Sequence, residues 1–427
     1  MSDFDLVVVG GGVAGCSAAI VAANEGLSVL LVERGEFPGA KNMTGGRLYS
    51  HSLEKILPGF IDEAPVERRV TRERISLMTS DSMTTVDFQS NLLTQTGADS
   101  YIVLRSRFDR WLSEKAEELG VVVASGIRVD ELLIKEGQVC GIKADEDEIE
   151  SEVMILADGV NSLLAQQAGL KKRLTGGQIA VGAKEIIELP AAVIEDRFNV
   201  NPGEGAAWLM SGCTEGGIGG GFLYTNSDSI SLGVVLTLSE VKKLKTSVPQ
   251  LLDQLKAHPS IQPLIRGGET VEYSAHLVPE GGQSTMPTLY DDRLMVVGDA
   301  AALVINTGYM VRGMDLAIAS GQMAAMTAVE AKAKGDFSAE ILKSYKDRLD
   351  ASFIGQDMDT YRRFPNFLET TPSIFGAYPQ LAAEVFVDLF RVDGAPAVPL
   401  MRRLRGYLKK IGLCRLVRDG YKGVKAL

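Results

Sequence analysis

A glycine-rich loop near the N-terminus constrains the fold of this 427-residue chain more than any other feature. The segment DLVVVGGGVAGCSAAI, residues 5–20, has the pattern of a strand buried on both faces, followed by a loop and a helix of small side chains. Gly10, Gly12 and Gly15 match the pattern G-x-G-x-x-G. In that pattern the first glycine makes a tight turn, the second lets a pyrophosphate approach the backbone, and the third lets helix and strand pack closely. The segment therefore predicts an α/β fold of the Rossmann-like, nucleotide-binding type.

The residues that flank this loop support a dinucleotide site. Val13 and Ala14 begin the predicted helix, so its N-terminal amides and its dipole would face the phosphates. The next predicted strand lies in LSVLLVERG and ends at Glu33. A carboxylate at this point, about 20 residues beyond the loop, can accept hydrogen bonds from the adenosine ribose. We therefore expect Glu33 and Arg34 to lie at the cofactor, and the acid disfavours a 2′-phosphate.

The segment after Arg34 favours a flavin over a nicotinamide cofactor. Residues 35–50 are rich in Gly, Pro, Asn and Thr, and they are too irregular for the next helix of a simple nicotinamide-binding fold. Such a loop can follow a long, extended cofactor. Within it, Gly45 and Gly46 would let the backbone approach a flat ring.

Two later strands are each expected to place a carboxylate in the same crevice. SEVMILADGVNS, residues 151–162, and DDRLMVVGDAAALV, residues 291–304, are apolar strands that end at an Asp beside a Gly. In the second, Gly298 and Asp299 would lie where the ribityl chain of FAD passes, so that the carboxylate accepts hydrogen bonds from its hydroxyls and the following helix faces the pyrophosphate. NAD has no ribityl chain, so this interpretation favours FAD.

Four short blocks, VVVGGGVAG, VLRSRFDRWL, ILADGVNS and VVGDAA, resemble the glutathione-reductase-type FAD fold, in the branch that aromatic hydroxylases and geranylgeranyl reductases share. The resemblance implies FAD as the cofactor. It also implies that Arg105 reaches the flavin-side phosphate, that Val129 lies beside the adenine, and that Asp158 supports the ribityl or pyrophosphate region.

Four longer blocks narrow the resemblance. GAKNMTGGRLYSHSLEKILPGF, GGGFLYTN, VEYSAHLVPEGG and VRGMDLAIASGQMAA are similar to the electron-transfer flavoprotein:quinone oxidoreductases in their short, FixC-type form, and the match covers nearly the full length. The resemblance implies an FAD-dependent oxidoreductase that passes electrons between an electron-transfer flavoprotein of two subunits and a quinone or ferredoxin-like acceptor. In some FixC-type assemblies NADH electrons are split between the two acceptors, which these residues do not decide.

The same resemblance assigns residues to the flavin ring and the acceptor. Residues 306–328 would close over the ring, with backbone amides near Gly313 and Met314 at a helix start stabilising the reduced flavin. Arg312 would add positive charge there, or else be a solvated loop charge. Candidates for contact with the ring or the acceptor are Gly220, Gly221, Tyr224 and His276, although a core tyrosine and a structural histidine are equally ordinary interpretations of the last two.

The chain is long enough for two or three domains. We expect an antiparallel α+β domain on the substrate side, because residues 171–287 alternate like strands and carry Gly- and Asn-rich turns. The glycines in GCTEGGIGGGFLYTN lead into a further strand, which disfavours a nicotinamide site there. The predicted division is an FAD-binding domain (1–75, 102–170 and 288–335), a quinone- or acceptor-side domain (76–101 and 171–287) and a helical C-terminal region (336–427).

The cysteines and the net charge limit the partners. The four cysteines are scattered and form no C-x-x-C pair, which disfavours a disulfide framework, a metal site and an iron–sulfur cluster. Full-length members of the resembled family carry a C-terminal iron–sulfur domain, whereas this chain has only Cys414 in that region. The resemblance therefore implies a separate FixX-like ferredoxin subunit. The formal net charge of −11 argues against nucleic-acid binding.

The C-terminal segment is basic although the chain as a whole is acidic. Residues 401–427 contain nine Lys or Arg and one Asp, and Leu404, Leu408 and Ile411 fall near helical spacing. Such a helix could rest on anionic lipid, bind an acidic ferredoxin, or simply pack with a solvated basic face. No signal peptide or membrane-spanning run is predicted, so we expect a cytoplasmic protein, with peripheral contact at the inner face of the membrane as the further expectation.

The sequence is also compatible with two other functions of proteins with this fold. One is an NAD(P)H-dependent flavin hydroxylase or polyprenyl (geranylgeranyl-type) reductase, which would need rapid flavin reduction by NADPH. The other is an assembly subunit that holds FAD chiefly as a structural element of a redox complex.

Overall fold

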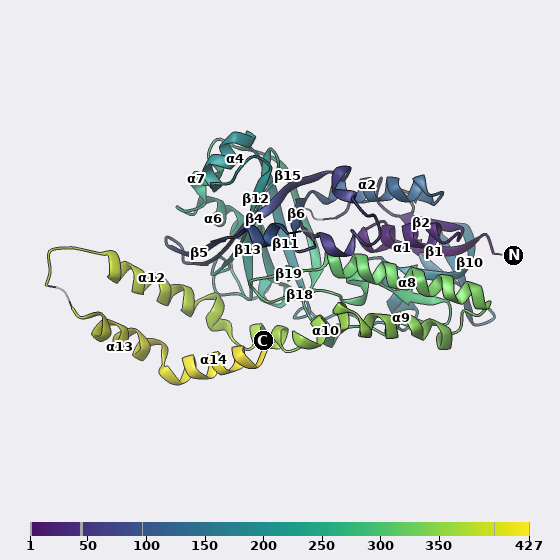
Figure 1. Cartoon of the computed structure of the whole chain (residues 1–427). Coiled ribbons are helices and arrows are strands. Elements are labelled where there is room, and N and C mark those ends of the chain that lie inside the picture. Colours follow the sequence, from purple (N-terminus) through teal and green to yellow (C-terminus); the bar gives the residue numbers. More distant parts are fainter. Residues whose placement is uncertain (1, 43–45, 96, 397, 427) are drawn as a thin grey trace.

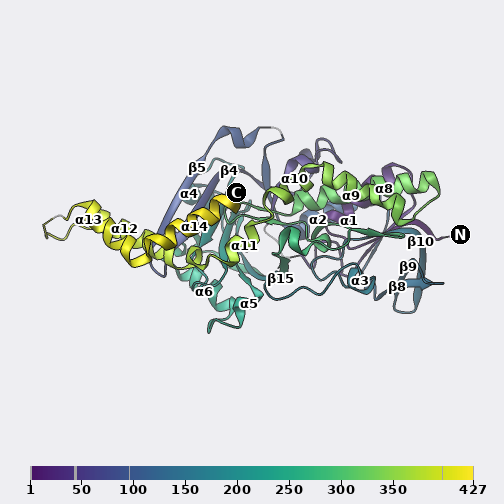
Figure 2. The same ribbon diagram turned by 90° about the horizontal axis from the view of Figure 1, so that it is seen from below.

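The computed structural model describes residues 2–42, 46–95, 97–396 and 398–426. Its two large β-sheets lie one after the other along the molecule (Figure 1), and β18 and β19 form a small two-stranded sheet. Helices α8 and α9 cover the sheet near the N-terminus, and helices α12 to α14 project beyond the second sheet (Figures 1 and 2). The bounds of these helices are Met314–Lys334 (α8), Ala339–Ala351 (α9), Ala377–Phe390 (α12), Leu400–Ile411 (α13) and Leu413–Ala426 (α14).

The first sheet is parallel at its centre. Strand β1 pairs in parallel with β2 on one side and with β10 on the other, and β10 pairs in parallel with β17. Because helices and loops cover both faces, these strands are runs of apolar residues rather than alternating ones. The strands are β1 (Phe4–Val9), β2 (Val29–Glu33), β7 (Val122–Ser125), β8 (Glu131–Lys135), β9 (Gln138–Ala144), β10 (Asp147–Leu156), β16 (Tyr290–Asp291) and β17 (Leu294–Val296), in the order β16-β17-β10-β1-β2-β7, with β8 and β9 attached to β10.

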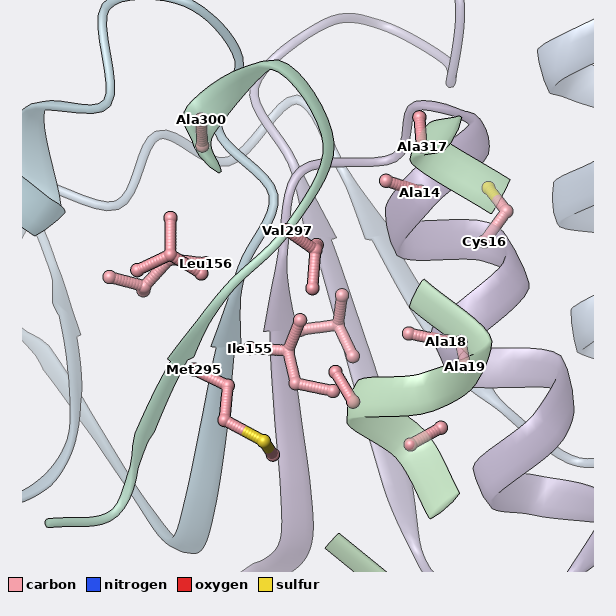
Figure 3. Close-up of a cluster of buried hydrophobic side chains, with 14 of the residues drawn as sticks. Ala14, Cys16, Ala18, Ala19, Ile155, Leu156, Met295, Val297, Ala300 and Ala317 are labelled. Carbon is pink, nitrogen blue, oxygen red and sulfur yellow. The ribbon is translucent and has the colours of Figure 1, made fainter. Parts of the chain in front are cut away.

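Small side chains let α1, which spans Val13–Asn24, pack directly against α8. A Cβ atom on Gly321 of α8 would lie 2.2 Å from the carbonyl oxygen of Ala14, so the two backbones touch. Figure 3 shows Ala14, Ala18 and Ala19 of α1 on one side of the cluster, with Ile155 of β10 and Met295 of β17 across from them. The main apolar core is therefore built between the parallel sheet and this helix pair.

The second sheet is antiparallel apart from the β4–β12 pair, and it confirms the predicted antiparallel α+β region. Its own core lies between the sheet and helices α4 and α6. The strands are β3 (Gly46–Tyr49), β4 (Val66–Met78), β5 (Met83–Gln89), β6 (Ser100–Val103), β11 (Ile179–Glu188), β12 (Glu204–Ser211), β13 (Gly219–Thr225), β14 (Ser229–Thr237) and β15 (Glu269–Pro279), in the order β15-β11-β14-β13-β12-β4-β6-β3 with β5 on β4. Further elements are α2 (Arg105–Glu118), α3 (Leu163–Gln167), α4 (Ala191–Phe198), α5 (Leu238–Val241), α6 (Val248–Ala257), α7 (Gln262–Ile265), α10 (Phe353–Thr360), α11 (Phe364–Glu369), β18 (Ile305–Asn306) and β19 (Val311–Arg312).

Strands β3 and β4 correct one predicted boundary. Residues 46–49 and 66–75 were assigned to the FAD-binding domain, but they belong to the second sheet, so a boundary at residue 75 falls inside β4. The charged sequence of β4, VERRVTRERISLM, does not read as a central strand. It is accommodated because its arginines are paired across the sheet, for example Arg72 with Asp87 of β5 at 2.7 Å. As domains, the three predicted units stay a prediction.

The C-terminal segment forms two helices rather than the single helix that was predicted. Gly412 separates α13 from α14, and its φ of +90° is a conformation that a helical residue does not adopt. Helix α13 returns along α12 through a hydrogen bond from Arg403 to the carbonyl of Asp388, at 2.8 Å. Among the described residues, no helix is long and apolar enough to cross a bilayer.

Candidate functional site

One cavity of about 700 Å³ brings together most of the residues predicted to bind the cofactor. Its walls come from the loops at the carboxyl ends of the parallel strands, from the start of α8, and from β13 and β15 of the second sheet. Crevices at the carboxyl ends of parallel strands are the usual ligand sites of α/β folds. The predicted residues that line it are Gly10, Gly12, Val13, Ala14, Glu33, Arg34, Gly46, Arg105, Val129, Asp158, Gly220, Gly221, Tyr224, His276, Asp299, Arg312, Gly313 and Met314.

Two of the described residues that were predicted to bind the cofactor do not line the cavity. Gly15 lies behind the loop, where a Cβ atom would be 1.9 Å from the carbonyl oxygen of Gly10. Gly298, with a φ of +59°, lies against α1, where a Cβ atom would be 2.9 Å from Cβ of Ala14. These two glycines therefore shape the wall rather than contact a ligand. Gly45 lies outside the described residues.

The glycine loop and the start of α1 form an anion-binding surface. Gly10 has a φ of +111°, and a Cβ atom there would lie 2.3 Å from the carbonyl oxygen of Ala157, so only glycine fits. The first hydrogen bond within α1 runs from the Cys16 amide to the Gly12 carbonyl at 2.9 Å, which leaves the preceding amides without an acceptor in the helix. The nearest neighbour of a Cβ atom added to Gly12 would be a guanidinium nitrogen of Arg105, 3.7 Å away. Open space, free amides and a cation fit a pyrophosphate.

Arg105 is fixed by a buried carboxylate. Its Nε and one terminal nitrogen each donate to Asp109 at 2.6 Å, and Asn42 also donates to Asp109. The Asp109 side chain is fully buried. Burial alone would lower the pKa of Arg105, but the charge and hydrogen bonds of Asp109 raise it above its ordinary value. The guanidinium is therefore permanently charged and held in one orientation beside the loop.

Glu33 also holds the glycine loop in place, a role that the sequence did not indicate. One carboxylate oxygen accepts the amide of Gly11 at 2.8 Å, and the other accepts the amide of Gly35 at 2.6 Å. These bonds hold the glycine loop to the end of β2. Each carboxylate oxygen has a second lone pair, so the side chain can still accept ribose hydroxyls from the cavity.

Asp158 and Asp299 lie at the tips of β10 and β17, as predicted, and a buried lysine that the sequence analysis missed lies beside them. Burial raises the pKa of both carboxyls above their ordinary value. Oδ1 of Asp158 is buried and accepts no hydrogen bond from the described residues. Asp158 and Asp299 both line the cavity next to the glycine loop, and carboxyl groups there fit a ligand that carries hydroxyl groups.

That lysine, Lys171, connects the two strand tips. Its ammonium donates to the carbonyl of Val160, after β10, at 3.1 Å and to the carbonyl of Ala300, after β17, at 2.9 Å. Burial lowers the pKa of Lys171, while the charges of the two carboxylates oppose that effect. No local sequence signal marks this lysine, because its acceptors come from segments that are distant in the sequence.

The helix expected directly after Asp299 is only one turn. The chain forms a 3-10 turn over Gly298–Ala301, and Ala302, with a φ of +58°, ends it. The first helix of full length after this turn is α8, which begins at Met314 beyond the irregular segment and β19. The N-terminal end of α8 lines the cavity beside Gly46, where a Cβ atom would lie 3.1 Å from the sulfur of Met314. A helix therefore starts near Gly313 and Met314, as expected, but no full-length helix starts at Asp299.

Arg312 also lines the cavity, but its charge is balanced. Its guanidinium donates to Asp315 at 2.9 Å from Nε and to Asp357 at 2.6 Å from a terminal nitrogen. Burial would raise the pKa of Asp315, but hydrogen bonds from His51 and Arg312 lower it below the ordinary range. With two ionised partners, Arg312 brings less net positive charge to the cavity than the sequence suggested.

Tyr224 and His276 face the cavity from the second sheet. Tyr224 lies on β13 beside Phe222, with ring centroids 5.5 Å apart, and burial raises its pKa. His276 lies on β15, and burial lowers its pKa, which favours the neutral imidazole with one donor nitrogen. The glycines of β13 serve packing as well, since a Cβ on Gly220 would lie 2.6 Å from the carbonyl oxygen of Met210.

Replacing Asp299 with alanine is expected to weaken FAD binding by about 1–3 kcal/mol, because the ribityl hydroxyls would lose a buried acceptor. Flavin absorbance after dialysis measures the bound fraction. Asp253→Ala, on the exposed face of α6, is the control and should keep full occupancy. Equal occupancy in the two variants would contradict the role of Asp299.

Comparisons with known proteins identify the family of the chain. The description "FAD dependent oxidoreductase" matches residues 5–184, "ETF-QO, ubiquinone-binding" matches residues 179–278, and "ETF-QO/FixC family C-terminal domain" matches residues 364–427. Protein FixC of Salmonella typhi is 49% identical over 425 residues, which is 99% of each chain. The probable electron transfer flavoprotein-quinone oxidoreductase YdiS of Escherichia coli K12 is 50% identical over 430 residues and covers 100% of both chains.

Solved structures share the fold at low sequence identity. A geranylgeranyl bacteriochlorophyll reductase-like protein from Thermoplasma acidophilum has a TM-score of 0.69 and 20% identity, covering 96% of this chain and 98% of its own. A flavin-dependent brominase has a TM-score of 0.65 and 17% identity, covering 95% and 99%. These neighbours confirm the FAD-binding fold, and the full-length relatives confirm the narrower resemblance. The chain belongs to the ETF-QO/FixC family and is an FAD-dependent oxidoreductase.

Proposed function

We propose that this protein accepts electrons from a two-subunit electron-transfer flavoprotein and passes them to a membrane quinone. Bound FAD would supply the redox chemistry, because a flavin can take up and release one or two electrons. The chain's residues would hold the cofactor through the glycine loop, Arg105 and the strand-tip carboxylates, and they would position the acceptor beside it.

The observation that carries the choice of quinone is the apolar wall of the cavity on the side of the second sheet. A quinone has a flat ring with two carbonyl oxygens and an apolar tail, so it needs an apolar channel with a few polar groups at one end. Tyr224 and the neutral ring of His276 supply donors there. The apolar residues are Ile75, Leu77, Leu209, Met210, Ile218, Phe222, Val235, Phe364, Phe367, Leu368, Ile374 and Phe375. The match to the ubiquinone-binding description over residues 179–278 supports the same choice.

The C-terminal helices provide a means of reaching a membrane quinone. Side chains such as Leu413, Val417 and Val424 are exposed on α14, among many Lys and Arg residues. Helix α14 packs on α11, whose Phe364 and Phe367 line the apolar part of the cavity. An amphipathic basic surface of this kind binds anionic lipid. We place α13 and α14 on the lipid surface, with the protein peripheral to the membrane.

A separate FixX-like ferredoxin subunit is the second candidate acceptor. The basic residues of α13 and α14 favour it, since a ferredoxin with an acidic surface would complement them. Reduced protein that is reoxidised by an acidic ferredoxin and not by quinone would favour this acceptor over the membrane pool.

Anaerobic mixing separates the proposed function from its rivals. Reduced electron-transfer flavoprotein should bleach the flavin rapidly, NADPH alone should not, and a soluble quinone should restore the oxidised spectrum. Rapid bleaching by NADPH alone would favour a hydroxylase or a polyprenyl reductase. Failure of both donors would favour a subunit that holds FAD as a structural element.

A pair of variants tests the apolar wall. Ile75 of β4 lines the cavity, and its cross-strand neighbour Val86 of β5 is exposed and does not. Ile75→Glu should raise the KM for quinone about tenfold or more, because a loss of 1.4 kcal/mol is already tenfold. Val86→Glu adds the same charge one strand away and should leave the KM unchanged. Equal effects of the two substitutions would argue against a quinone at this wall.

A further inference from the structure

Glu280 lies between two cavities. It follows β15 directly, and it lines both the large cavity and a small one of about 10 Å³. His276, Val278 and Glu280 are two residues apart along the strand and its extension, and all three line the large cavity. The small cavity has room for about one water molecule, and it is bordered by the polar residues Gln283, Asn306 and Tyr361.

Hydrogen bonds fix the orientation of the Glu280 carboxyl. The amide of Gly308 donates to Oδ1 of Asn306 at 3.0 Å, so Nδ2 of Asn306 is the group that donates to Oε2 of Glu280, at 3.3 Å. The Glu280 amide is tied to the carbonyl of Gln178 at 2.9 Å. With Oε2 engaged as an acceptor, Oε1 is the oxygen that can carry a proton.

Two tyrosines lie between the small cavity and solvent. Tyr361 borders the small cavity, and burial together with the nearby hydroxyl of Tyr309 raises its pKa. Tyr309 is exposed and also lines the rim of the large cavity. These two hydroxyl groups therefore offer a proton a route from solvent to the small cavity.

The surroundings of Glu280 contain few charges. No described Lys, Arg or carboxylate side chain forms an ion pair or hydrogen bond with it, and burial raises its pKa to about 7. The carboxyl is thus half protonated near neutral pH, and its proton is lost as the pH rises through 7. The titratable and charged groups on the neighbouring elements are His276 on β15, Tyr309 before β19, Arg312 on β19 with its partners Asp315 and Asp357, and Tyr361 after α10.

We propose that Glu280 delivers a proton to the quinone that is reduced in the large cavity, an inference that rests on the function proposed above. Conversion of a quinone to a quinol takes two electrons and two protons. Bound flavin in its reduced form would supply both electrons and one proton, and Glu280 would supply the second proton. The O–H bond of the carboxyl breaks, an O–H bond forms on the quinol, and the Glu280 carboxylate then takes a proton from water through the small cavity.

Two oxidants distinguish proton delivery from a structural role. Holoprotein reduced under anaerobic conditions is mixed with a soluble quinone, which takes up protons, or with ferrocenium, which takes up only an electron. Wild-type protein should react with quinone more slowly as the pH rises through about 7. Glu280→Gln should lower the quinone rate about 100-fold and remove this pH step, while the ferrocenium rate stays the same. Glu280→Asp keeps an acid and should restore part of the rate and of the pH step.

The control is Glu269→Gln, at the exposed start of the same strand, which should leave both rates unchanged. A readout without FAD is the infrared carboxyl band of the apoprotein, which should titrate near pH 7 and be missing in Glu280→Gln. The proposal would be overturned by an unchanged quinone rate in Glu280→Gln, by equal losses of rate with both oxidants, or by the absence of the carboxyl band. Each of these results would leave the proposed function intact. Wild-type protein that does not react with quinone at all would refute the proposed function and this proposal with it.

Discussion

Replacing Arg105 with alanine is expected to lower the free energy of unfolding by about 3–5 kcal/mol and to abolish FAD binding. Asp109 is fully buried and receives two hydrogen bonds of 2.6 Å from Arg105, so the variant would leave an ionised carboxylate without its counter-ion. Breaking one partner of a buried ion pair costs about this much. Denaturant unfolding measures the stability, and flavin absorbance measures the bound cofactor.

A double variant separates the two effects. Arg105→Met with Asp109→Leu removes both charges, and replacing a buried ion pair with apolar residues is often neutral for stability. The double variant should therefore unfold near the wild-type midpoint but stay colourless, because no cation remains beside Gly12. Recovery of FAD binding together with stability would show that Arg105 serves only the fold.

Replacing Gly15 with alanine is expected to destabilise the protein by about 3 kcal/mol and to remove most of the bound FAD. The added Cβ would lie 1.9 Å from the carbonyl oxygen of Gly10, which is backbone and cannot rotate away. Helix α1 would have to move from β1, and the amides at its start would move with it. Thermal unfolding and flavin occupancy measure the two losses.

Gly406 in the middle of α13 is the matched control, since a Cβ there meets no atom within 4 Å. Gly406→Ala should raise the stability slightly, by about 0.5–1 kcal/mol, because alanine favours a helix more than glycine does. Full FAD occupancy in Gly15→Ala would mean that the loop tolerates a displacement of the helix.

The elements of the fold that depend on residues close together in the sequence could be predicted from the sequence. The spacing of the glycines and the apolar strand before them predict the β1–α1 unit. Two short apolar runs, each followed by an acidic residue, predict that Asp158 and Asp299 lie at the ends of strands. The glycine pattern does not show which glycines face a ligand. Gly12 borders the cavity while Gly15 packs behind the loop, and both belong to the same motif.

The features that were missed depend on partners that are distant in the sequence. Strand β4 is charged, and it becomes a central strand only because Arg68 and Arg72 meet Glu195 and Asp87. Arg312 has a different electrostatic role from the predicted one because Asp357 reaches it from α10. Likewise, Glu280 becomes notable only when β15 meets the segment after β17, which no spacing rule predicts.

The lysine between the strand tips has a consequence for how the holoprotein forms. Because the ammonium of Lys171 bonds to backbone carbonyls on both sides of the crevice, the distance between the two tips is set by the polypeptide itself. The receptor is thus preorganised, and little conformational entropy is lost when the dinucleotide enters. Apoprotein should keep the spectroscopic signature of its folded core and regain colour at a rate proportional to the concentration of added FAD.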